Sequence, residues 1–198
     1  MNYQYHDGGR KAAGYQGLAG DCVTRAIAIA TGQSYQTVYD ALNGLAKIET
    51  KSKRRRGKSS ARNGVHRVTY QKYLADLGWV WVPTMFIGSG CKVHLATGEL
   101  PGGRLIVAVS RHLVAVVNDV IYDTHDPRRE VHVIDRDVGQ ALKPGQWRNV
   151  NGVCSVQRRC VYGYYRPPTC KICNGTGIER VPGGGAFDCE CELVVPCA

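Results

Sequence analysis

Three apolar segments with very short connections occupy the middle of the chain and constrain its fold most. They are GRLIVAVS (103–110), RHLVAVV (111–117) and VIYDT (120–124). The sequence period in this part of the chain is close to two, which is typical of strands. The last two segments flank Asn118 and Asp119, a dipeptide suited to a tight hairpin turn. We therefore expect an antiparallel sheet, to which segments 79–86, 130–138 and 160–165 add further strands.

Helical patterns precede this sheet. We expect a first helix over 21–32, capped by Asp21 and stopped by Gly32, and a second over 34–45, capped by Ser34. A third helix is expected over 68–78. The apolar residues of the inward faces are Val23, Ala26, Ile27 and Ala30; Val38, Leu42 and Leu45; and Tyr70, Tyr73, Leu74 and Leu77. Helices followed by an antiparallel sheet indicate an α+β fold.

Composition narrows the class of protein. The chain has 198 residues, of which 43% are hydrophobic and 21% charged, as in an ordinary globular protein. No stretch approaches the ~20 apolar residues of a membrane span, and the N-terminus lacks the apolar core of a secretory signal. We therefore expect a cytoplasmic protein without a secreted disulfide framework and without membrane partners.

Most of the net positive charge lies in one segment. The formal net charge is +10, and residues 51–62 (KSKRRRGKSSAR) hold seven basic residues and no acidic one. Such a loop can bind nucleic acid or another acidic surface. A solvated loop that aids solubility is an equally good interpretation.

A cysteine near the start of the first predicted helix is a candidate nucleophile. Cys22 directly follows the expected cap, where backbone N–H groups and the helix dipole favour a thiolate. The carboxylate of Asp21, next to this thiol, is expected to oppose that effect by raising the thiol pKa. A small buried structural cysteine is the alternative interpretation.

The expected hairpin brings a histidine and a carboxylate together. With a two-residue turn at 118–119, Val114 pairs with Asp123 and His112 with His125, so that Asp123 lies diagonally from His112 on one face. A carboxylate there can bond one imidazole nitrogen and leave the other for a thiol. Asp126 is the second candidate for this carboxylate.

These residues resemble the papain-like cysteine peptidases, and most closely the bacteriocin-processing peptidases that cut after double-glycine leaders. The resemblance lies in YQGLAGDCVTRAIAIATG and RLIVAVSRHLVAVVNDVIYDTHDP. It implies a papain-like fold in which Cys22 is the nucleophile, His112 the general base and acid, and Asp123 the orienting group. Gln16, six residues before the cysteine, would be the oxyanion donor. The segment 14–165 also resembles short uncharacterised proteins of phages and bacteria, which implies a bacterial host cell.

The last 29 residues contain five of the nine cysteines. Four of them form two close pairs, Cys170 with Cys173 and Cys189 with Cys191, a set suited to one tetrahedral Zn²⁺. Cys197 could replace a member of the second pair. The sequence CKICNGTG resembles the zinc-binding repeats of DnaJ-type chaperones. A segment this short with so few apolar residues needs a metal to fold, so we expect a structural zinc knuckle.

The expected organisation is a papain-like hydrolase domain over 1–166 and a zinc-binding tail over 167–198. The first functional hypothesis is a thiol hydrolase that cleaves a peptide, isopeptide or related amide through an acyl-enzyme on Cys22. The second is a catalytically inactive papain-like adaptor or nucleic-acid-binding protein that uses the basic loop and the zinc knuckle. The third is a cell-wall amidase or endopeptidase.

Overall fold

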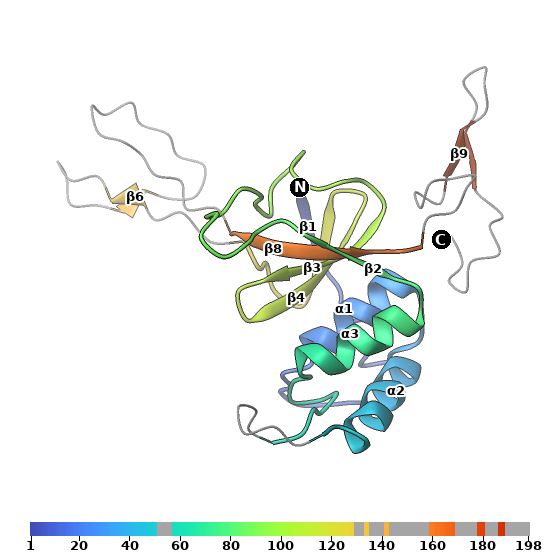
Figure 1. Ribbon diagram of the computed structural model, residues 1–198. Helices are drawn as coiled ribbons and strands as arrows, with labels where there is room; N and C mark the ends of the chain where they lie inside the picture. The colour runs from blue at the N-terminus through green and yellow to red at the C-terminus, as the bar shows by residue number, and fades with distance from the viewer. Residues whose placement is uncertain are drawn as a thin grey trace, which may run out of the picture.

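The computed structural model describes residues 1–50, 57–128 and 159–168, together with the backbone of four short strands beyond residue 128. Three helices lie on one side of a six-stranded sheet (Figure 1). The helices are α1 (Cys22–Thr31), α2 (Tyr35–Lys47) and α3 (Arg67–Asp76). The sheet has the order β1-β5-β4-β3-β8-β2. Its strands are β1 (Asn2–Tyr5), β2 (Val80–Pro83), β3 (Arg104–Val109), β4 (His112–Val117), β5 (Val120–Asp123) and β8 (Val161–Arg166). The expected α+β class is confirmed.

Local signals place the helix boundaries close to the predicted ones. Gly32 ends α1 in the left-handed conformation, with φ of 74°. The Ser34 side chain caps α2 by accepting a hydrogen bond from the Thr37 backbone N–H, at 3.0 Å. Asp21 is the N-cap residue of α1, as predicted, but its side chain makes no cap hydrogen bond and is buried in a charged cluster instead. No helix in the described part of the chain is long and apolar enough to cross a membrane.

The β4–β5 hairpin has the predicted register. Val117 pairs with Val120, and the next two pairs continue the same register as far as Tyr122. Asn118 and Asp119 both have positive φ, of 47° and 65°, which the two-residue turn requires. The β3–β4 connection is equally tight, because Val109 pairs with His112.

The sheet is mixed, and the expectation of an antiparallel sheet is wrong at one edge. There β1 pairs in parallel with β5, from Asn2 with Val120 to Tyr5 with Asp123. The sequence of this strand, NYQY, is polar and mostly exposed, so it carries no alternating apolar pattern. Backbone hydrogen bonds to an existing edge hold it in place, which is a tertiary rather than a local signal.

Apolar side chains cover both faces of the sheet. One cluster joins the helices to the sheet, including Ile27 of α1 and Ile106 of β3. The second covers the opposite face, where Leu95 from the 84–103 connection packs against Val107 and Val114. A disulfide between Cys91 and Cys160 fastens this connection to the residue before β8. The sequence predicted no disulfide partner for either cysteine.

Several predicted features fall wholly or partly outside the described residues. Within 130–138 the structure describes β6 (Val133–Ile134) alone, whose backbone pairs with β7 (Ala141–Leu142) in a separate two-stranded sheet. The proposed zinc ligands Cys170, Cys173, Cys189 and Cys191, with Cys197, all lie outside them, as does 51–56 of the basic segment. In 57–62, Ser59 and Ala61 are buried, whereas Gly57 and Lys58 are exposed, so this half of the segment is only partly solvated.

Candidate active site

Three elements bring the candidate catalytic residues to one edge of the sheet. Cys22 is the first residue of α1, His112 the first of β4, and Asp123 the last of β5. Because β4 and β5 are antiparallel, the start of one and the end of the other lie at the same edge. Helix α1 packs on β4, which brings its first turn to that edge.

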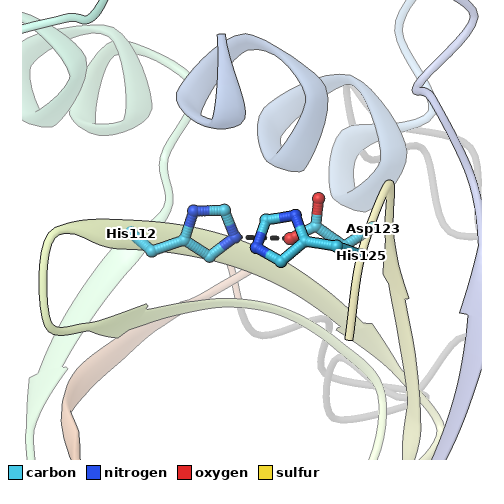
Figure 2. A group of neighbouring side chains, drawn as sticks. All are labelled: His112, Asp123 and His125. Carbon is cyan, nitrogen blue, oxygen red and sulfur yellow. Dashed lines mark hydrogen bonds and ion pairs between the residues drawn. The ribbon is translucent and has the colours of Figure 1, made fainter. Parts of the chain in front are cut away.

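The His112 ring lies between a thiol and a carboxylate. Its Nε2–H donates to Oδ2 of Asp123, the bond that Figure 2 shows as a dashed line. A second hydrogen bond joins the ring to Cys22. Since Nε2 faces Asp123, Nδ1 is the nitrogen left for the sulfur. This is the order of groups that a thiol nucleophile, its general base and an orienting carboxylate require.

The pKa values of the three groups shift in the directions that favour an ion pair. Burial opposes the charge on His112, but its bonds to Asp123 and Cys22 outweigh burial and raise its pKa to about 9. Burial also opposes the Cys22 thiolate, yet the His112 hydrogen bond, the Leu113 backbone and nearby positive charge lower the thiol pKa. Burial likewise opposes the Asp123 carboxylate, and the bond to His112 lowers its pKa. Together these pKa shifts favour a Cys22 thiolate beside a His112 imidazolium.

The missed strand β1 anchors the backbone of Asp123. The His6 backbone N–H donates to the Asp123 carbonyl at 2.9 Å, and the Tyr3 hydroxyl donates to the same oxygen at 3.3 Å. Beyond β1 the chain passes close to α1 at Gly8, where an added Cβ would lie 3.0 Å from the Cα of Arg25. Gly8 has φ of +68°, so both the space and the backbone conformation suit glycine here.

A buried ionic cluster, missed at the sequence level, lies behind the carboxylate. Arg25 donates to Oδ1 of Asp21 and, from Nη2 at 3.3 Å, to Oδ1 of Asp123. Asp21 also accepts from the Tyr35 hydroxyl at 2.6 Å and pairs with Arg10 at 3.1 Å. Three donors thus hold the Asp21 carboxylate, and the Cys22 thiol pKa is lowered although Asp21 is the preceding residue. The only sequence signal for the cluster is the i, i+4 spacing of Asp21 and Arg25 on one helix.

The structure distinguishes the two candidate carboxylates. Asp123 is 3% exposed and reaches His112. Asp126 is exposed and instead pairs with Arg128, whose Nε lies 2.9 Å from its Oδ1. The hairpin register therefore identified the carboxylate that bonds His112.

The predicted oxyanion donor has a different setting. The Gln16 side chain is exposed, and the described contacts of this residue involve its backbone carbonyl. That oxygen accepts from Arg10 at 2.9 Å and from Arg62 at 3.1 Å. The two arginines position the chain that leads to Cys22, and the role of the Gln16 side chain stays a prediction.

A separate groove lies near the other end of α1. Its volume is about 790 Å³, and it is bordered by Gly8, Ala13, Gly32, Tyr35 and Tyr122, among others. Cys22, His112 and Asp123 do not line it. The groove is therefore separate from the cluster of Cys22, His112 and Asp123 at the sheet edge.

Comparison with known proteins gave no match to a protein-family model, to a curated protein or to a solved structure.

Proposed function

We propose that this chain is a thiol hydrolase of papain-like architecture that cleaves a peptide, isopeptide or related amide. One observation carries the proposal: the His112 imidazole is hydrogen-bonded to the Cys22 thiol and to the Asp123 carboxylate. A structural cysteine does not need an imidazole held in this way by a buried carboxylate. The lowered Cys22 pKa and the raised His112 pKa support the same conclusion.

In the first half of the reaction the Cys22 thiolate attacks the amide carbonyl carbon and forms a C–S bond. The His112 imidazolium gives its Nδ1 proton to the leaving nitrogen, the C–N bond breaks, and the amine departs. The acyl group is then held as a thioester on Cys22. Asp123 accepts the hydrogen bond from Nε2–H throughout and holds the orientation of the ring.

Hydrolysis of the thioester completes the cycle. Neutral His112 takes a proton from water while the water oxygen attacks the acyl carbon. The C–S bond breaks, the carboxylic acid product leaves, and the thiolate–imidazolium pair is restored. The backbone N–H of Cys22 and the side chain of Gln16 would stabilise the oxyanion in both halves.

Labelling with an electrophilic amide-mimic probe tests this proposal. We expect one probe per chain on Cys22, identified by peptide mass spectrometry, and loss of labelling in Cys22→Ala. His112→Ala should slow labelling at least 100-fold, the usual contribution of general acid–base catalysis. His94→Ala is the matched control, because His94 also pairs with a carboxylate, that of Glu99 at 3.0 Å. Equal labelling of all these proteins, or none of the wild type, would favour the inactive adaptor.

We further propose that the tail binds one structural Zn²⁺ through Cys170, Cys173, Cys189 and Cys191. The backbone described in this region supports the proposal. Strand β9 (Ile178–Arg180) pairs antiparallel with β10 (Ala186–Asp188), and Ile178 pairs with Asp188. This hairpin lies within the connection between the two cysteine pairs and reverses the chain direction, as a shared metal requires.

Metal analysis of protein purified under reducing conditions, without chelators, tests the tail. We expect about one tightly held zinc per chain, because four thiolates complete a tetrahedral site. Cys170→Ser should release that zinc, whereas Cys22→Ser should retain it. A zinc-free wild-type protein would contradict the knuckle.

A further inference from the structure

A third side chain lies next to the His112–Asp123 pair. The exposed ring of His125 is 5.0 Å, between centroids, from the ring of His112. One ligand atom from each of His112, Asp123 and His125 lies within 4.8 Å of the others. Figure 2 shows the two imidazoles and the carboxylate gathered at the same place. In the reaction described above, His125 has no part.

The donor set suits a divalent transition-metal ion. Two imidazole nitrogens and one carboxylate oxygen are ligands that Zn²⁺ accepts, and a three-ligand site leaves a position for water. Zinc bonds of ~2.0–2.2 Å place neighbouring ligand atoms a little over 3 Å apart. The His125 nitrogen therefore lies within a short movement of the site, whereas Nε2 of His112 and Oδ2 of Asp123, now hydrogen-bonded, must move apart to admit the ion. His125 is exposed, so an ion can reach the cluster from solvent.

Asp123 already has hydrogen-bond partners of the kind that orient a metal-binding carboxylate. The Thr124 backbone N–H donates to Oδ1 at 2.7 Å, and Arg25 Nη2 lies 3.3 Å from the same oxygen. Oδ2 faces His112. The carboxylate is thus oriented through one oxygen and can offer the other to an ion, as ligating carboxylates in metal sites do.

We propose that His112, Asp123 and His125 form a regulatory zinc site in which the ion takes the place of the proton between His112 and Asp123. Binding forms bonds from Zn²⁺ to Nε2 of His112, Oδ2 of Asp123 and one ring nitrogen of His125, and the displaced proton goes to solvent. The ring then keeps its Nδ1 proton as a neutral, metal-bound imidazole, which is a much weaker acid than an imidazolium and has no free nitrogen to take a proton from water, so zinc occupancy stops turnover. This regulatory half rests on the proposed thiol hydrolase function, whereas the binding site itself does not.

Equilibrium dialysis of the full-length protein against Zn²⁺ tests the site independently of activity. Wild type and the control His94→Ala should bind one zinc more per chain than His125→Ala, whatever number the tail binds. We expect His125→Ala to weaken this additional zinc at least ~10-fold, the lower end for damage to the shell of a metal site. His125 is exposed, so its replacement is compatible with folding. Equal zinc content in wild type and His125→Ala would overturn the site.

Probe labelling of Cys22 with and without zinc tests the regulation. Each protein is compared with its own zinc-free rate. Zinc should slow labelling at least 10-fold in wild type and His94→Ala, and His125→Ala should need correspondingly more zinc. Equal inhibition of wild type and His125→Ala would show that zinc acts on Cys22 itself. Unchanged labelling of zinc-loaded wild type would show that the bound ion does not affect the reaction of Cys22. Either result overturns the proposed regulation. Absent labelling in zinc-free wild type would overturn the hydrolase, while dialysis still decides the site.

Discussion

Alkylation of Cys22 by iodoacetamide is expected to fall less steeply between pH 8 and pH 6 than that of an ordinary thiol. An ordinary thiol with a pKa of ~8.5 loses thiolate over this range, so the rate for glutathione should fall roughly 75-fold. Cys22 should lose less of its rate over the same range, because its hydrogen bond to His112 lowers its pKa despite burial. At pH 6 we expect it to react up to about 10-fold faster than glutathione, since a lower pKa also reduces intrinsic nucleophilicity.

His112→Ala should return Cys22 to the steep pH dependence of glutathione, and His94→Ala should not. Cys91 and Cys160 are not suitable internal references, because they are joined in a disulfide. The upper limit of the active range follows from His112, whose pKa is raised to about 9. Above that pH the imidazolium loses its proton, so reactions that need it as an acid should slow. Parallel pH profiles for Cys22 and glutathione would contradict an activated thiol.

Replacing Arg25 is expected to cause the largest loss of stability. Arg25→Met leaves the carboxylates of Asp21 and Asp123 buried without the guanidinium between them; these residues are 1% and 3% exposed. Removing one partner of a buried ion pair costs about 3–5 kcal/mol. We expect a decrease of that size in the free energy of unfolding, measured by urea denaturation at pH 7.

Lys72→Met is the matched control for this prediction. Lys72 and Asp76 form an ion pair with the same i, i+4 spacing as Asp21 and Arg25, but both of their side chains are more than half exposed. Exposed pairs contribute only about 0–1 kcal/mol because water screens them. An Arg25→Met loss no larger than that of Lys72→Met would show that the buried cluster does not stabilise the fold.

The sequence predicted the parts of the fold that depend on neighbouring residues. Gly32 ends α1 and Ser34 begins α2, since each acts within one helical turn. The two turn residues Asn118 and Asp119 set the β4–β5 register. That register was enough to identify Asp123, rather than Asp126, as the partner of His112. For these features the deciding contact is local, so the sequence shows it directly.

Contacts between residues distant in the sequence decided the rest. Strand β1 is polar and pairs with β5 through backbone hydrogen bonds, so no side-chain pattern in the sequence predicts it. Asp21 had two uses for its carboxylate, as a helix cap or in an ion pair. The burial of Arg25 selected the second, because a buried guanidinium needs an anion. The sequence alone determined which residues could supply the thiol, the imidazole and the carboxylate. Only the packing of α1 on β4 placed Cys22 against His112, because that contact joins residues 90 positions apart in the sequence.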